Sequence, residues 1–390
     1  MSSAKFRHVK VSGISTIVPS KEICIYDEAQ YYAGNIKKID RMRKMVGFYK
    51  RRVVDNETIT PSDLAICAAE KLLSGMKIDR NSIDALLLVV QTPDYVAPAS
   101  AFLVQDKLKL PHSCMALDIN LGCPGWVYAM HLAHCMIESG AHKRILLLVA
   151  DTPSTKVDIA DRINAPLFGD AASATLLEYS ENTADETFFN LGADGSGHDA
   201  IIIPAGGARL PLRFGNGYKE DYNDILTSAI VSKTGNTTNL TQKQMDGMKV
   251  FDFTMKVVPE KIKEIMSEAS ITPKDVDKLV LHQANKQIIE SVCNLSGFPL
   301  DMCSSTTFEQ YGNQTVASVP STICHTLQKE ITSNNGIKIL CAGFGIGLAW
   351  GTCIITLKNV FCNGIEIFDS NTSNNSRKDV AEYWIKKIKG

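Results

Sequence analysis

Two short runs in this chain are apolar at every position. Residues 85–90 read Ala-Leu-Leu-Leu-Val-Val, and residues 145–150 read Ile-Leu-Leu-Leu-Val-Ala. A strand that is apolar on both faces has to be covered on both sides, which is typical of a parallel sheet packed between helices. Because such runs alternate with segments of helical periodicity, the sequence predicts an α/β fold.

The same alternation returns in the second half of the chain. Strands are expected at 278–281, 337–342 and 352–357, with a helix over 287–295. Two comparable halves indicate a duplicated α/β unit that divides near residue 180.

Two segments stand outside this alternation. Residues 205–245 are rich in Gly, Asn, Thr and Lys and lack periodicity, so they are expected to form a long surface excursion. A polar linker follows at 369–376, and residues 378–389 are expected to form a short helix docked on the body of the protein.

Composition limits the compartment and the cofactors. The chain has 390 residues, 45% of them hydrophobic, a net charge of −1, and eleven cysteines without CxxC spacing or histidines at metal-ligand distance. We therefore expect a large core, no disulfide framework, no metal site and no cofactor. Without a signal peptide or an apolar run near 18 residues, the sequence predicts a cytoplasmic protein with no membrane partner.

One stretch is strongly basic. Between Lys37 and Arg52, eight of sixteen residues are Lys or Arg, and Asp40 is the one acid. The stretch is either a solvated helix face or a patch for phosphate or an acidic partner. No aromatic interleaving or nucleic-acid-binding motif accompanies it, so nucleic acid is not an expected partner.

Cys123 follows an apolar run, residues 115–119, that predicts a buried strand. The strand breaks at Gly122, and a helix is expected from Pro124 to Gly140. Since proline suits the first helical position, the cysteine would lie at a strand-to-helix elbow, on the positive end of a helix dipole. That position lowers the pKa of a thiol, although a free cysteine can also be a plain core residue.

Two further polar residues stand at strand ends or glycine turns. His282 comes directly after an expected buried strand, and Asn313 follows a glycine and precedes a helix of small residues. Alone, each would be read as structural. Together with Cys123 they indicate a site, because ligands collect at the strand ends along one edge of an α/β sheet.

These motifs together resemble β-ketoacyl-acyl carrier protein synthase III, of the thiolase superfamily. The likeness is carried by Cys123 in its elbow, His282 in the motif HQAN, and Asn313 in YGNQTVAS. It runs from about residue 8 to residue 357, and is supported by four further stretches: Phe168-Gly-Asp170, Ala193-Asp-Gly-Ser196, residues 245–251 and residues 343–351.

The resemblance implies a five-layered, duplicated α-β-α-β-α fold and a homodimer. Residues 1–180 would form the N-terminal half with the cysteine, and residues 181–358 the C-terminal half with the histidine and asparagine. A surface insertion at 210–245 and a C-terminal extension at 359–390 would be additions to this pattern.

The resemblance also implies the chemistry. Cys123 would attack a primer thioester and hold the acyl group. His282 and Asn313 would then stabilise the enolate that forms when a malonyl thioester loses carbon dioxide. The backbone N–H groups of Cys123 and Ile346 would meet the oxyanion of the condensation step.

The chain departs from the family pattern where the primer would bind. Arg41 and Met45 stand where the well-studied bacterial enzymes place the Trp and Arg that hold the adenine of coenzyme A. The partners implied are therefore acyl carrier protein or coenzyme A thioesters, with the carrier favoured by the basic stretch.

The acyl pocket departs from the family pattern as well. Ala97 replaces an aromatic residue that often caps the partner subunit's acyl pocket, so a deeper pocket and a longer or branched primer are expected. Ile346, in place of Gly or Ala, would narrow the site. Further candidates for substrate or carrier binding are Asn285, Lys286, Trp126 and Phe344.

Other functions stay open at this point. A related enzyme could use the same three residues to pass an acyl group to an alcohol or amine without decarboxylation. Hydroxymethylglutaryl synthases carry a catalytic glutamate where this chain reads Gln91-Thr-Pro93. A cysteine hydrolase is a remote alternative, because Gly122 to Trp126 does not match the papain-type signature. A binding subunit would be expected to lack the cysteine or the histidine.

Overall fold

The computed structural model describes residues 2–55, 59–181, 186–212, 221–231, 237–369 and 376–389. Its strands form two large sheets. The first sheet has the strand order β17 (Ile365–Ile367), β2 (Val9–Val18), β8 (Ala171–Tyr179), β7 (Arg144–Asp151), β5 (Ala85–Val89) and β6 (Met115–Ile119). The second has the order β1 (Ser2–Phe6), β9 (Thr187–Ala193), β16 (Ala349–Leu357), β15 (Ile337–Gly345) and β14 (Lys278–Leu281).

Four strands of each sheet share one pairing pattern. In the first sheet, β2 pairs antiparallel with β8, β8 antiparallel with β7, and β7 parallel with β5. In the second, β9 pairs antiparallel with β16, β16 antiparallel with β15, and β15 parallel with β14. The ends of the chain cross over, since β1 joins the second sheet and β17 joins the first. The division of the chain into halves near residue 180 stays a prediction.

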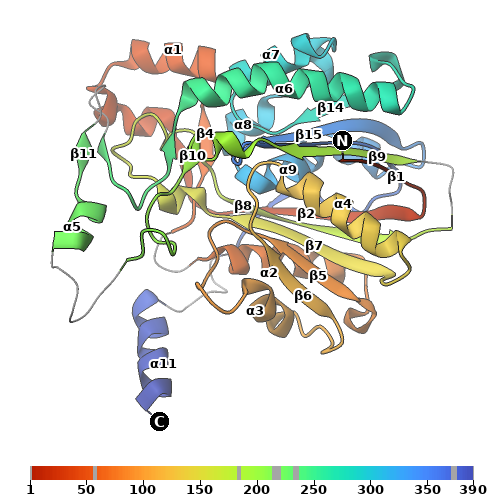
Figure 1. The fold of residues 1–390 in the computed structure, drawn as a ribbon, viewed down its shortest axis with the longest axis horizontal. Helices are drawn as coiled ribbons and strands as arrows, with labels where there is room; N and C mark the ends of the chain where they lie inside the picture. The colour runs from red at the N-terminus through yellow and green to blue at the C-terminus, as the bar shows by residue number, and fades with distance from the viewer. Residues whose placement is uncertain are drawn as a thin grey trace.

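Helices fill three layers around these sheets (Figure 1). The helices α2 (Pro61–Gly75) and α3 (Ser100–Lys107) cover the outer face of the first sheet, and α6 (Gly247–Glu268) and α7 (Lys286–Leu295) cover that of the second. Between the sheets lie α4 (Gly125–Glu138) and α9 (Ser318–Thr326). The expected five-layered α/β fold is confirmed.

The alternation of side chains on the central strands explains the layers. On β5, Ala85, Leu87 and Val89 belong to the core between the sheets. Leu86 and Leu88 belong to a separate core under α2 and α3. A third core lies under α6 and α7. A strand buried on both sides needs apolar residues at every position, which is the pattern that the sequence shows.

Smaller elements complete the fold. The strands β3 (Glu22–Cys24) and β4 (Lys50–Arg52) form an antiparallel pair, and α1 (Ile36–Val46) lies between them in the sequence. The others, listed in chain order, are β10 (Ile201–Ile202), α5 (Asp221–Thr227), β11 (Ile230–Val231), β12 (Thr237–Thr238), β13 (Gln244–Met245), α8 (Thr306–Tyr311), α10 (Gln328–Ile331) and α11 (Arg377–Lys389).

Two sequence predictions about the edges of the molecule were wrong. The strand before Cys123, β6, is not buried: within the described ranges it pairs on one side only, with β5, and Met115 is exposed. The helix α11 forms, but its apolar side chains, including Trp384 and Ile388, are exposed rather than docked. Its described contact with the body is between the rings of Trp384 and Tyr95, with 6.1 Å between their centroids. Within the excursion 205–245 and the linker 369–376, residues 213–220, 232–236 and 370–375 lie outside the described residues.

Arg51, at the end of the basic stretch, is a structural residue. Its guanidinium donates two hydrogen bonds, of 3.0 and 2.7 Å, to the carboxylate of Glu28, and both side chains are buried. Arg162 donates a further one of 2.9 Å to the same carboxylate. Burial would raise the pKa of Glu28, but the hydrogen bonds and charges of the two arginines lower it.

Arg51→Met should lower the free energy of unfolding by about 3–5 kcal/mol, because it leaves a buried carboxylate with half of its partners. The control is Lys50→Met, since Lys50 pairs with Glu22 in a half-exposed position, where water screens an ion pair and leaves it little effect on stability. Urea denaturation measures both. Because the pKa of Glu28 is lower in the folded protein than its ordinary value of about 4.5, the ion pair stabilises the fold above that pH. This stabilisation is lost as the pH falls further and the carboxylate takes up a proton. Equal stability of the two variants would contradict the structural role.

Candidate active site

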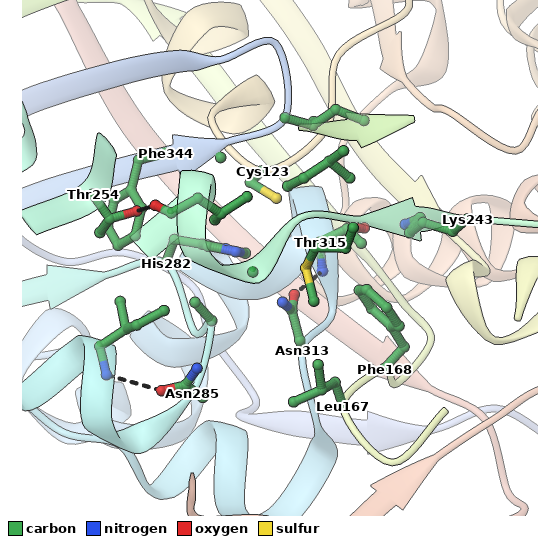
Figure 2. A pocket seen from close by; sticks show the side chains of 18 of the residues that line it. Cys123, Leu167, Phe168, Lys243, Thr254, His282, Asn285, Asn313, Thr315 and Phe344 are labelled. Carbon is green, nitrogen blue, oxygen red and sulfur yellow. Dashed lines mark hydrogen bonds between the residues drawn. The ribbon is translucent and has the colours of Figure 1, made fainter. Parts of the chain in front are cut away.

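Cys123, His282 and Asn313 line one cavity of about 160 Å³. The cysteine comes from the elbow before α4, the histidine from the end of β14, and the asparagine from the turn after α8. Figure 2 shows the three side chains converging from separate elements. Most of the cavity wall is apolar, including Leu167, Phe168, Ile201, Met245, Val250, Phe251, Ile288, Phe344 and Ile346.

The residues 345–346 pack closely against the elbow that carries Cys123. A Cβ added to Gly345 would lie 2.9 Å from the Cys123 sulfur, and one added to Gly122 would lie 2.5 Å from the Ile346 side chain. Glycines are therefore needed on both sides of the sulfur. Pro124 is the residue before the first helical one, so α4 begins one position later than the sequence predicted.

The thiol of Cys123 is not acidified, contrary to the sequence prediction. Its side chain is buried, and burial raises the pKa of the Cys123 thiol. The charge of Lys243 and backbone hydrogen bonding from Ile346 and Cys123 act in the opposite direction without outweighing burial. A position at a helix start therefore does not by itself give a thiolate when the sulfur is removed from water.

The raised pKa predicts a pH dependence. Iodoacetamide should alkylate Cys123 faster as the pH rises, with a midpoint above about 8.5, the value of an ordinary thiol, because the thiolate is the reacting form. Intact-protein mass spectrometry measures the rate, and Cys123→Ala corrects for the other ten cysteines. A midpoint near pH 7 would contradict the raised pKa.

His282 is a buried, neutral imidazole. Its Nδ1 lies 2.6 Å from the Ser318 hydroxyl, and that hydroxyl oxygen accepts a weaker hydrogen bond, of 3.5 Å, from the backbone N–H of Gln283. Burial lowers the pKa of His282 to about 3, and the charge of Lys243 contributes. If the Ser318 hydroxyl donates to Nδ1, the proton of the ring is on Nε2. His282 is then a hydrogen-bond donor into the cavity at neutral pH.

Asn313 is fixed in a similar way. Its side-chain oxygen accepts a 3.0 Å hydrogen bond from the backbone N–H of Thr315, which leaves the NH₂ group for the cavity. Its backbone pairs with Leu167 and Gly169, at 2.7 and 3.1 Å. A Cβ on Gly169 would collide with the Tyr311 carbonyl oxygen, which explains the glycine in the Phe168-Gly-Asp motif.

The buried carboxylate of Asp151 holds the turn that carries Asn313 and Thr315. Asp151, at the end of β7, accepts hydrogen bonds of 2.9 Å from the Thr315 hydroxyl and 2.5 Å from the Thr92 hydroxyl. Sequence reasoning missed Asp151, Thr315 and Ser318. For Asp151, the available signal was its place at the end of a buried strand.

Of the other candidate residues, Phe344, Asn285 and Ile346 line the cavity. Asn285 also caps α7, where its side chain accepts a hydrogen bond from the Ile288 N–H. Trp126 was placed wrongly: it is 1% exposed, and its ring nitrogen donates to the Thr175 hydroxyl in the core between the sheets.

A second, polar hollow of about 340 Å³, which we call the basic hollow, lies where the basic stretch meets α7. It is lined by Tyr26, Asp40, Arg43, Lys44, Gly47, Tyr49, Lys286 and Glu309. The guanidinium of Arg43 stacks 4.0 Å from the centre of the Tyr49 ring. Arg41 and Ala97 are exposed and line neither hollow, so the positions that face the basic hollow are Arg43 and Lys44.

Lys243 also lines the cavity, and nothing in the sequence pattern pointed to it. It lies just before β13, in the stretch without periodicity, yet its side chain reaches the cavity wall. Within the described ranges, no group of three or more His, Cys, Asp or Glu residues is placed to hold a metal ion. Among the same residues, no helix is long and apolar enough to cross a membrane.

Two layered sheets and a cavity shared by a cysteine, a histidine and an asparagine define the thiolase class of proteins. Comparison with known proteins narrows this class. The family models "3-Oxoacyl-[acyl-carrier-protein (ACP)] synthase III" and "3-Oxoacyl-[acyl-carrier-protein (ACP)] synthase III C terminal" match residues 117–195 and 266–357. The chain belongs to the 3-oxoacyl-[acyl-carrier-protein] synthase III family.

Individual relatives support this over nearly the whole chain. The chain is 33% identical over 365 residues to a "Putative 3-oxoacyl-[acyl-carrier-protein] synthase 3" of Campylobacter jejuni, covering 93% of this chain and 98% of the relative. It is 33% identical over 316 residues to a "Beta-ketoacyl-[acyl-carrier-protein] synthase III" of Clostridium perfringens, covering 81% and 90%. The crystal structure of a 3-oxoacyl-(acyl-carrier protein) synthase from Burkholderia xenovorans superimposes with a TM-score of 0.82 at 30% identity, covering 94% and 99%.

Proposed function

We propose that this enzyme condenses an acyl thioester primer with malonyl-acyl carrier protein, with loss of carbon dioxide and through an acyl-Cys123 intermediate. The observation that carries the proposal is the meeting of Cys123, His282 and Asn313 in one largely apolar cavity. An apolar wall suits an acyl chain, and three polar groups at its centre suit the chemistry of a thioester.

In the first step, the Cys123 sulfur bonds to the carbonyl carbon of the primer, the bond from that carbon to the carrier sulfur breaks, and the proton of the Cys123 thiol passes to the carrier sulfur, which leaves as a thiol. In the free enzyme, the backbone N–H groups of Cys123 and Ile346 hydrogen-bond to the Cys123 sulfur. During the reaction, they would donate hydrogen bonds to the negatively charged oxygen of the tetrahedral intermediate. The acyl group then occupies the apolar part of the cavity.

In the second step, the malonyl thioester binds beside the acyl-cysteine and loses carbon dioxide. The negative charge moves to its thioester carbonyl oxygen, where His282 Nε2–H and the Asn313 NH₂ would stabilise it as hydrogen-bond donors. The resulting carbanion bonds to the acyl carbon, the bond between that carbon and the Cys123 sulfur breaks, and the released sulfur takes up a proton to become a thiol again. A neutral imidazole suits this role, because it already carries the proton that it donates as a hydrogen bond.

We propose that the carrier approaches through the basic hollow. Asn285 lines the cavity, and the next residue, Lys286, lines the basic hollow, so a phosphopantetheine arm could pass between them. Arg43 and Lys44 would meet the phosphate or the acidic carrier in place of Arg41. Coenzyme A stays an alternative donor.

We also propose a homodimer built along β6. Among the described residues nothing pairs with the outer side of this edge strand, and the large side chains of Met115 on β6 and Phe102 on the adjoining α3 are exposed. Pairing of two β6 strands would cover that edge and place each Ala97 loop near the other subunit. Light scattering in solution tests the mass. The cytoplasm stays a prediction from the cysteine usage.

Carbon dioxide release from malonyl-acyl carrier protein, measured with and without a primer, tests the proposed reaction. We expect release coupled to the formation of a 3-oxoacyl product. Transfer of the primer to an alcohol or amine without carbon dioxide would favour the acyltransferase alternative, and hydrolysis alone would favour a hydrolase.

A further inference from the structure

The cavity holds one charged residue that the proposed reaction does not use. Lys243 is 6% exposed, and among the described lining residues it is the only Lys, Arg, Asp or Glu. Within the described part of the chain, its ammonium has no carboxylate at salt-bridge distance. Its Nζ lies 4.4 Å from the centre of the Phe168 ring, on the cavity wall.

A buried ammonium ordinarily needs a partner. Lysine is rarely this buried unless it is paired, because removing its charge from water costs free energy. The ring of Phe168 offsets part of that cost through a cation–π contact, but it accepts no hydrogen bond of ordinary strength. A ligand that carries an acceptor with negative charge would complete the environment of Lys243.

The position of Lys243 indicates which part of a ligand it would meet. In Figure 2, its nitrogen points into the cavity above Phe168, on the far side of Cys123 and Asn313 from Asn285. Asn285 adjoins Lys286 and the basic hollow, through which the carrier arm would enter. Lys243 therefore lies toward the end of the cavity that the acyl chain of a primer would fill.

We propose that Lys243 receives a carboxylate at the far end of the primer, so that the enzyme is primed by an ω-carboxyacyl thioester. This inference rests on the proposed condensing function and specifies its substrate class. In the loading step, the Cys123 sulfur bonds to the thioester carbonyl carbon, the bond from that carbon to the carrier sulfur breaks, and the carrier leaves as a thiol with the proton from Cys123. The distal carboxylate takes no part in the bond changes. A single ammonium suits one carboxylate, whereas phosphate is more often met by several donors.

Two other roles for Lys243 make different predictions. Binding the malonyl carboxylate would stabilise the ground state of a group that has to lose its charge, which slows decarboxylation. Stabilising the Cys123 thiolate would help every primer equally. Only recognition of a distal carboxylate predicts a preference between primers that differ at that end.

The test uses three pairs of primers matched in chain length: glutaryl and valeryl, adipyl and hexanoyl, suberyl and octanoyl. Each is offered to the full chain on acyl carrier protein and on coenzyme A, and the rate of mass gain on Cys123 is measured. We expect the unmodified enzyme to prefer the carboxylated member of at least one pair. Lys243→Met should lower that preference by about 10- to 100-fold, and Lys243→Arg should retain part of it.

The matched control is Lys249→Met, since Lys249 is exposed on α6 and pairs with Asp199 outside the cavity. It should leave the preference unchanged. Cys123→Ala reveals any acylation of other residues. Loading of the uncarboxylated primers alone, or an equal loss for both members of a pair in Lys243→Met, would overturn the assignment while the proposed function stands. No loading by any primer would overturn both.

Discussion

Cys123→Ala should abolish acyl loading and lower kcat/KM for condensation by at least about 10⁴-fold, since Cys123 is the one cysteine among the described residues that line the cavity. Of the remaining residues around the cavity, His282 and Asn313 supply hydrogen bonds but no sulfur. Intact-protein mass spectrometry measures loading, and product formation from malonyl-acyl carrier protein measures condensation.

The matched control is Cys135→Ala, at a cysteine on α4 that is half-buried and does not line the cavity. It should change the rate less than about threefold. Cys123→Ala keeps His282 and Asn313, so slow release of carbon dioxide from malonyl-acyl carrier protein should survive it. Acyl loading of Cys123→Ala equal to that of the unmodified chain would place the nucleophile elsewhere and contradict the proposal.

The fold could be predicted because its signal is local. Strand β5 and residues 145–150 of β7 are apolar at every position, and that pattern has few solutions other than a sheet covered on both faces. The edge strand β6 shows the limit of this reasoning. Its apolar residues look like those of a buried strand, but their exposure depends on what pairs beside them, which the sequence of one strand does not state.

The candidate site was predictable where motifs mark it and unpredictable where packing decides. Cys123, His282 and Asn313 each follow a strand or a glycine turn, so their meeting could be expected. Lys243 lies in a stretch without periodicity, and only the folded chain brings it to the cavity. Trp126 was predicted to bind substrate or carrier, but it lies in the core. Helical spacing shows that a side chain faces inward and does not show whether it meets a cavity or other core residues.

The electrostatics of the site could not be predicted from position alone. A helix start favours a thiolate, and this led to the expectation of an acidified Cys123. The layers on both sides remove the sulfur from water, and burial then raises its pKa. The same burial keeps His282 neutral, so the two side chains are better described as a thiol and a hydrogen-bond donor than as an ion pair.

His282→Ala and Asn313→Ala should each slow condensation by about 10²–10³-fold and leave acyl loading of Cys123 within about threefold, because both groups act on the enolate and not on the sulfur. The acyl-enzyme should therefore accumulate in each variant when malonyl-acyl carrier protein is added. Mass spectrometry of the trapped intermediate and carbon dioxide release separate the two steps.

Two exposed residues supply matched controls, His198→Ala and Asn294→Ala, which should leave both steps unchanged. Ser318→Ala should slow condensation by less than His282→Ala does, since it removes the partner of Nδ1 and keeps the ring. Because the pKa of His282 is about 3, condensation should show no loss from protonation of this histidine between pH 5 and 7. If loading fell as far as condensation in His282→Ala, the imidazole would be acting on the sulfur, and the division of labour proposed for the three residues would be wrong.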